Sequence, residues 1–142
     1  MRREGSCPCG AVRYAIEGAV RDVLVCHCAG CCDATGGPWA ASAARRGDLA
    51  VADESALAWE RAAVSEHGAS RGSCHACGMM VFWDAAGRDT VSFAVATLAD
   101  RSGLELAGHI WVGDGEQASL PEDGVSRYAT GLPSSVIVPW RV

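Results

Sequence analysis

All eight cysteines of the chain lie in three short clusters, and clustered thiols in a protein are ordinarily held by a metal ion. The central cluster is Cys26-His27-Cys28-Ala29-Gly30-Cys31-Cys32, in which three cysteines have C-x-C-x-x-C spacing and a fourth follows directly. Residues 33–38 show neither a helical nor a strand period, so we expect this cluster to lie in a loop. The other cysteines form two pairs, Cys7–Cys9 and Cys74–Cys77.

The two outer pairs have the pattern of a structural zinc site. Each pair is followed directly by a glycine, Gly10 or Gly78, and glycine tolerates the backbone turn that brings two sulfurs to one ion. Two such pairs supply four thiolates, which complete a tetrahedral zinc site. We therefore predict one closed zinc site made by Cys7, Cys9, Cys74 and Cys77.

The central cluster predicts a second zinc site with fewer ligands. Cys31 and Cys32 are adjacent, and neighbouring side chains of an extended backbone point to opposite sides. One ion would then take Cys26, Cys28 and Cys31, and its fourth position would be open to water or substrate, as in catalytic zinc sites. The alternative is a closed site, completed by Cys32 or by a distant histidine.

Composition bounds the remaining possibilities. The 142 residues, 49% of them hydrophobic, fit a single domain over residues 1–142. The net charge is −5 and all twelve basic residues are scattered arginines, which argues against nucleic-acid binding. The start has no apolar run typical of a signal peptide, and no stretch is long enough for a membrane span. We expect a cytoplasmic protein that does not bind a membrane.

The elements that must position the cysteines read as short strands. Alternating or continuous apolar residues predict strands, with turn residues between them, so the expected fold is mainly β. Gly18-Ala19 suggests a hairpin between the first two of these strands, and residues 65–72 read as a polar loop. Residues 57–64 read as a strand or a helical turn. The other expected strands are 11–17, 20–25, 39–43, 49–52, 79–83, 90–97, 109–112 and 135–140.

Several of these segments together resemble the glutathione-dependent formaldehyde-activating enzymes and their relatives in the centromere protein V family. The matching segments are Gly5–Tyr14, Cys26–Cys31 with Ala34–Trp39, Cys74–Gly78, Ala96–Asp100 and His109–Trp111, in family order. The resemblance implies several coiled β-sheets stapled by zinc, a structural zinc on Cys7, Cys9, Cys74 and Cys77, and a catalytic zinc on Cys26, Cys28 and Cys31. Cys32 is a departure, because the family usually has Arg or Gln after the third ligand.

The resemblance also implies a reaction. It is that of a carbon–sulfur lyase similar to S-(hydroxymethyl)glutathione synthase, which acts on the adduct of a small thiol, glutathione or another, with formaldehyde or a related carbonyl compound. The alternatives are a non-enzymatic zinc module that binds a protein partner and a thiol redox sensor. We further expect His27 to face solvent, with a contact to a bound thiolate as the alternative, and His109 to be a structural histidine.

Overall fold

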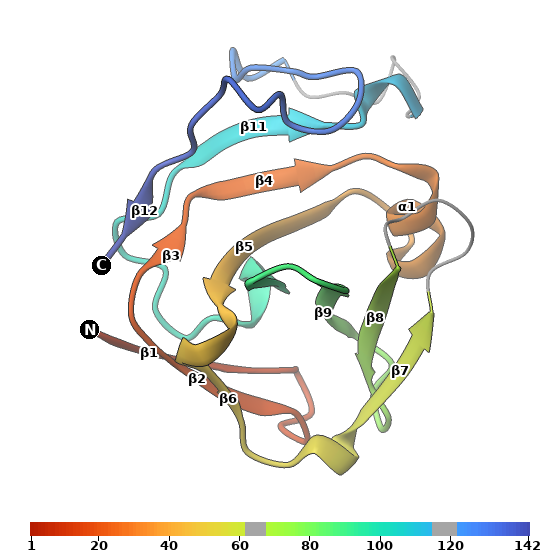
Figure 1. Cartoon of the computed structure of the whole chain (residues 1–142). Coiled ribbons are helices and arrows are strands. Elements are labelled where there is room, and N and C mark those ends of the chain that lie inside the picture. The colour runs from red at the N-terminus through yellow and green to blue at the C-terminus, as the bar shows by residue number, and fades with distance from the viewer. Residues whose placement is uncertain (62–67, 115–121) are drawn as a thin grey trace.

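The computed structural model describes residues 1–61, 68–114 and 122–142, and within them the chain is mainly β, as predicted. One α-helix and four short 3-10 turns interrupt the strands of the described ranges. Figure 1 shows the strands wrapped around one another, with α1 at one end. The strands and the helix are β1 Arg2–Ser6, β2 Arg13–Glu17, β3 Val20–Arg21, β4 Val23–Cys26, α1 Ala29–Thr35, β5 Trp39–Arg45, β6 Leu49–Val51, β7 Leu57–Arg61, β8 Ala69–Cys74, β9 Met80–Ala85, β10 Thr90–Ala94, β11 Leu106–Ile110 and β12 Trp140–Arg141.

A small sheet in the order β1-β2-β6 packs its inner face into the main core. Arg3 is buried on this face, and its guanidinium donates hydrogen bonds of 2.9 Å to the carbonyl oxygens of Asp100 and Ser102. The ring of Tyr14 lies across Gly5, where a Cβ would be 2.1 Å from the ring, and only glycine leaves that space. The strand β1 of this sheet ends at Ser6, directly before the first cysteine pair.

The larger sheet runs in the order β11-β4-β5-β10-β9-β8-β7, and beside it β3 pairs with β5 and β12 pairs with β3. Two of its strands deliver cysteines: β4 ends at Cys26 and β8 ends at Cys74. The strands β4 and β11 are parallel, so that Ile110 lies opposite Cys26 and His109 opposite Val25. The sheet thus places the end of β11 beside the central cysteine cluster.

Several expectations about individual elements were wrong. The expected hairpin across Gly18-Ala19 does not form, because β2 pairs with β1 and β6 whereas β3 pairs with β5 and β12. The expected loop after Cys28 contains the helix α1, and the expected polar loop 65–72 contains the start of β8. The expected final strand 135–140 is reduced to β12. Of the expected strand 57–64, residues 62–64 lie outside the described residues, and the described part is β7.

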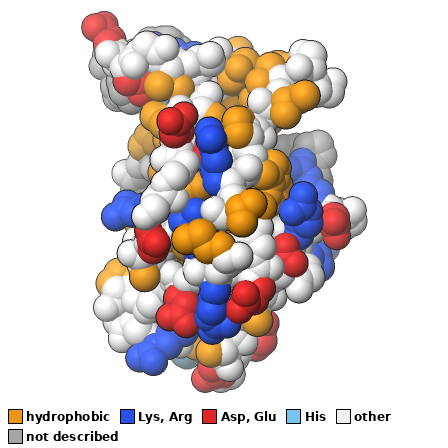
Figure 2. All heavy atoms as spheres, turned by 90° about the vertical axis from the view of Figure 1, so that its left-hand side faces the viewer, with side chains coloured by type: hydrophobic (Ala, Val, Ile, Leu, Met, Phe, Trp, Pro, Cys, Tyr) orange, Lys and Arg blue, Asp and Glu red, His pale blue; other side chains and the backbone are white. Residues whose placement is uncertain are grey.

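The surface shown in Figure 2 carries basic and acidic side chains interspersed, with apolar side chains between them. This is the face on which both chain ends lie in Figure 1. In the described ranges, no helix combines the length and the apolar character that a membrane crossing requires.

Candidate metal centres

The two outer cysteine pairs meet in space. The sulfurs of Cys7, Cys9, Cys74 and Cys77 all lie within 4.8 Å of one another, although the pairs are separated by 65 residues between Cys9 and Cys74. The Cys7–Cys9 and Cys9–Cys74 sulfur separations are 3.5 and 3.6 Å. A tetrahedral ion with metal–sulfur bonds of about 2.3 Å requires sulfurs roughly 3.8 Å apart, so this group fits a four-coordinate metal ion.

The backbone of the two pairs follows the same turn. Gly10 donates to the carbonyl oxygen of Cys7 at 3.0 Å and Gly78 to that of Cys74 at 2.9 Å. Both glycines have left-handed φ angles, +81° and +78°, which other residues adopt with strain. In each pair the first cysteine is buried and the second is exposed. The glycine after each pair thus turns the chain back, as the sequence suggests.

The central cluster gathers three sulfurs from a single short stretch. Those of Cys26, Cys28 and Cys31 lie within 4.8 Å of one another. Cys26 ends β4, and Cys28 is the N-cap of α1, where its sulfur accepts a hydrogen bond of 3.3 Å from the backbone N–H of Cys31. Capping of the first helical turn, which otherwise leaves N–H groups without partners, therefore also orients a candidate ligand.

Cys32 belongs to α1 and is outside the group of three sulfurs. Its thiol is directed back toward the carbonyl oxygen of His27, at 3.7 Å. The expectation that Cys31 and Cys32 point to opposite sides assumed an extended backbone, and that assumption was wrong. On a helix, successive side chains are instead rotated by about 100°, which also separates the two thiols.

Within each group the cysteine pKa values shift in opposite directions: those of Cys9, Cys26 and Cys31 are raised, and those of Cys7, Cys28 and Cys74 are lowered. The backbone N–H of Cys77, 3.4 Å from the sulfur of Cys74, is the main cause that lowers the pKa of Cys74 to about 6. Contacts with the side chains of Cys26 and then Cys31 bring the pKa of Cys28 well below its usual range. Thiolates are the form of cysteine that binds metals, so Cys74 and Cys28 are the members of the two groups that most favour that form.

Comparison with known proteins identifies the family of the chain that carries these cysteine groups. The model of the family described as glutathione-dependent formaldehyde-activating enzyme matches residues 2–114, which is most of the chain. The chain belongs to this family. Among curated proteins, none matches it. A Rhodobacter sphaeroides structural-genomics protein of known crystal structure has a TM-score of 0.57 and 22% identity, covering 88% of this chain and 98% of its own, and it shares the fold.

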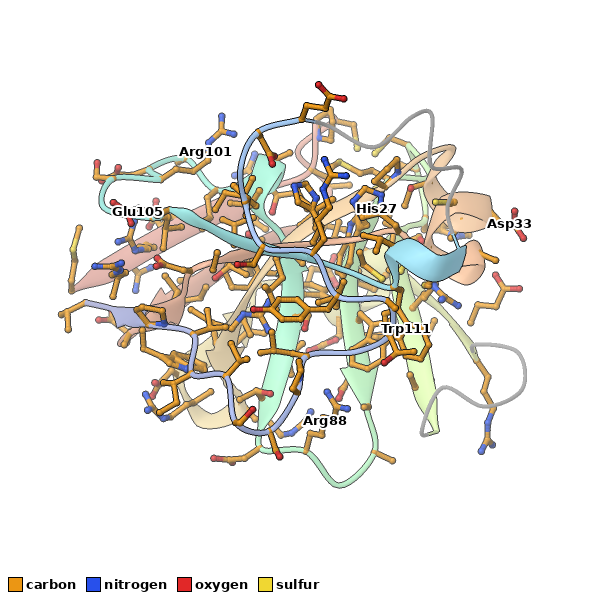
Figure 3. All side chains as sticks on the ribbon, turned by 90° about the horizontal axis from the view of Figure 1, so that it is seen from above. His27, Asp33, Arg88, Arg101, Glu105 and Trp111 are labelled. Atoms are coloured by element: carbon orange, nitrogen blue, oxygen red, sulfur yellow. The ribbon has the colours of Figure 1, made fainter. Side chains whose placement is uncertain are left out.

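Family membership confirms the resemblance drawn from the sequence, and both predicted cysteine groups come together in space. The three-cysteine group lies within a small apolar cluster of its own. Trp39 is buried there, and Trp83 and Trp111 pack against it from the side. Figure 3 shows His27 and Trp111 at the end of the molecule where α1 lies, with Asp33 on α1 pointing outward.

Trp111 has an unusual backbone conformation. Among the described residues other than glycine it alone has a positive φ, +57°. Two backbone hydrogen bonds stabilise this conformation. The N–H of Trp111 donates to the carbonyl oxygen of Thr130 at 2.9 Å, and the N–H of Val112 donates to that of Tyr128 at 3.1 Å. Strained residues of this kind cluster at functional sites. The apolar character of Trp111 is evident from the sequence, but its backbone conformation is not.

The expectation that His27 faces solvent was wrong. Only 3% of His27 is exposed, and its ring lies against that of His109, which is 2% exposed. Burial, followed by the charges of His109 and Arg127, lowers the pKa of His27. His109 in turn contacts Asp123. His109 is thus a buried histidine with partners, and Asp123 is a residue that sequence analysis missed, since acidic residues are common in polar segments of a sequence.

A broad hollow of about 630 Å³ lies away from the cysteines, lined by residues that include Arg46, Trp59 and Asp84. Arg46 and Asp84 form a two-pronged ion pair across it, with N–O distances of 2.6 and 2.9 Å. None of the cysteines lines this hollow.

Proposed function

We propose that the chain is a zinc-dependent carbon–sulfur lyase or synthase that acts on the adduct of a small thiol with formaldehyde or a related carbonyl compound. Zinc on Cys7, Cys9, Cys74 and Cys77 would be structural, and zinc on Cys26, Cys28 and Cys31 would be catalytic. The observation that carries the proposal is the group of three sulfurs with Cys32 turned toward the His27 carbonyl. Such a donor set leaves one position of a four-coordinate ion for an outside ligand.

When bound at the three-cysteine group, zinc would supply a coordination position that holds a thiol sulfur in its thiolate form. The chain's own residues prepare that position. The N–H of Cys31 and the neighbouring thiols favour the thiolate of Cys28, and the apolar side chains of Trp39 and Met80 pack in the same cluster as the cysteines. Three thiolates make a poor Lewis acid of the ion, which favours binding of sulfur over activation of a carbonyl oxygen.

The addition of the thiol to the carbonyl compound requires no further reactant. The thiol sulfur forms a bond to the carbonyl carbon, the carbonyl π electrons move to oxygen, and the proton lost by the thiol ends on that oxygen. The product is a hydroxymethyl thioether, and the lyase direction reverses each change. The chain has no lysine, so it offers no lysine imine as another way of holding the aldehyde. We also propose that residues 1–142 act as one domain in this reaction.

The proposal is tested with cobalt in place of zinc. Titration with glutathione, and then with other small thiols, should change the cobalt–thiolate charge-transfer bands of the wild-type protein. The change should disappear in Cys28→Ser, which removes a ligand of the open site and leaves the four-cysteine site intact. If no thiol perturbs the wild-type spectrum, the lyase proposal fails and a protein-binding zinc module becomes the better account.

A further inference from the structure

The side chains of Asp123, His109 and His27 form a row of hydrogen-bonded groups. The row ends at His27, which lies between the candidate ligands Cys26 and Cys28 in the sequence. The backbone around Cys28 is extended, with φ −64° and ψ 152°, so the side chain of His27 points to the side opposite its cysteine neighbours. There the Nε2 atom of His27 lies 2.9 Å from Nδ1 of His109. The His27 backbone N–H also donates to Ile110 at 2.9 Å. Both the ring and the peptide of His27 are therefore held by β11.

The ring of His109 is also held at its other nitrogen, Nε2. Nε2 of His109 lies 2.8 Å from Oδ2 of Asp123, and the other carboxylate oxygen of Asp123 accepts a hydrogen bond of 3.0 Å from the N–H of Val125. The segment around Asp123 is itself tied to β11. His109 N–H donates to Ser126, and Tyr128 N–H donates to His109, at 2.9 and 2.8 Å. Asp123 is thus held in place at both oxygens and through the backbone that follows it.

The carboxylate of Asp123 determines which nitrogens of the two histidine rings carry protons. An ionised carboxylate only accepts hydrogen bonds, so Nε2 of His109 must carry a proton. When both rings are neutral, Nδ1 of His109 is then the acceptor and Nε2 of His27 is the donor, which gives each buried ring one tautomer and one orientation. The carboxylate uses both oxygens as acceptors, which an amide at the same position cannot do.

We propose that Asp123 is a positioning residue for the three-cysteine site, which acts through His109 to fix the ring of His27 and with it the peptide that carries Cys26 and Cys28. The inference rests on the proposed metal site and not on the proposed reaction. Asp123 lies outside residues 2–114, which match the family model. The C-terminal part of this chain thus contributes to a site whose ligands all lie in the matched part.

The experiment measures zinc retention site by site. Wild type, Asp123→Asn and Asp100→Asn are loaded with zinc and challenged with a chelator, and the number of zinc ions per chain is followed by native mass spectrometry. Asp100→Asn is the matched control, because Asp100 also accepts a backbone N–H two residues on, from Ser102 at 2.9 Å, and has no histidine partner in the described residues. We expect Asp123→Asn to lose one zinc about tenfold faster, the size typical of partners that orient metal ligands. The zinc of the four-cysteine site should leave at the wild-type rate.

A second measurement needs no variant. In wild-type protein labelled with ¹⁵N, histidine spectra should show both His27 and His109 protonated at Nε2 and bare at Nδ1. The proposal is overturned if either ring has the other tautomer, if Asp123→Asn matches Asp100→Asn, or if it releases both zinc ions equally fast. It is also overturned if wild type holds no metal at the three-cysteine site. If the effect on zinc release appears but no thiol binds, the proposed reaction fails and the positioning role stands.

Discussion

The two cysteine groups begin alike and diverge at one residue. Cys74–Cys77 and Cys28–Cys31 have the same spacing, and in both the N–H of the second cysteine donates to the sulfur of the first, at 3.4 and 3.3 Å. The next residue is Gly78 in one group and Cys32 in the other. Gly78 is left-handed and turns the chain back, whereas Cys32 continues into α1. The residue after the pair decides whether the turn closes or becomes a helix.

This difference separates two uses of the same local geometry. The first group joins the N-terminal segment to the end of β8, so a metal there closes a long loop and stabilises the fold. The second draws its sulfurs from six consecutive residues, so a metal there constrains little chain. Its ligands are instead held in place by the end of β4, by the N-cap of α1 and by the buried His27. We therefore expect changes at the first group to affect stability, and changes at the second to affect binding.

The largest expected effect is that of Cys77→Ser. It removes one ligand of the four-cysteine group and should lower the free energy of unfolding by roughly 4 kcal/mol or more, as loss of a structural metal does. Cys31→Ser should lose one zinc with a much smaller loss of stability and no remaining activity. Thermal unfolding of both variants, with zinc content measured in parallel, checks this. Equal unfolding temperatures for Cys77→Ser and wild type would remove the distinction between the groups.

The next effect is that of the turn glycine. At Gly78 nothing lies within 4 Å of an added Cβ, so Gly78→Ala tests the left-handed φ of +78° alone. We expect a loss of about 1 to 2 kcal/mol, with faster release of the four-cysteine zinc. Gly37→Ala is the matched control beside the other group, with equally open space and no positive φ. Denaturant unfolding should separate the two variants, and similar losses from both would show that the turn is unimportant.

A smaller effect is expected at Trp111. In Trp111→Gly the backbone strain of φ +57° is relieved, by roughly 1 kcal/mol, while the indole that packs against the three-cysteine cluster is lost. These two changes oppose each other, so stability should change little. Affinity for a small thiol in the cobalt titration should fall severalfold, and Trp111→Phe should retain most of it. If Trp111→Gly binds thiol as tightly as wild type, the indole has no part in the site.

The grouping of the cysteines could be predicted because ligand spacing is a local property of the sequence. Elements stabilised by distant residues could not. β1 contains Arg3 at a buried position because carbonyl oxygens about a hundred residues away accept its hydrogen bonds. The segment that contains the start of β8 has the composition of a polar loop. Gly72 contributes apolar surface only because the ring of Trp59 covers it, 2.9 Å from where a Cβ of Gly72 would lie.

The missed parts of the site have the same origin. The helix α1 has seven residues, too few to show a helical period, and its N-cap is a cysteine, which is not among the usual capping residues. The contacts of His27 with His109, and of His109 with Asp123, link segments 82 and 14 residues apart. Histidines in a loop and at a strand start carry no sign of such pairing, so solvent exposure was the natural expectation for His27.

The smallest expected effect bears most directly on the central claim, that one group is closed by four cysteines and the other is left open with three. Cys32→Ser should leave the zinc content unchanged, because the Cys32 thiol is directed to the His27 carbonyl and not to the other three sulfurs. Native mass spectrometry of zinc-loaded protein measures this directly. We predict two zinc ions per chain in both wild type and Cys32→Ser. One zinc in Cys32→Ser beside two in wild type would show that Cys32 closes the second site, and the open three-cysteine site would then be wrong.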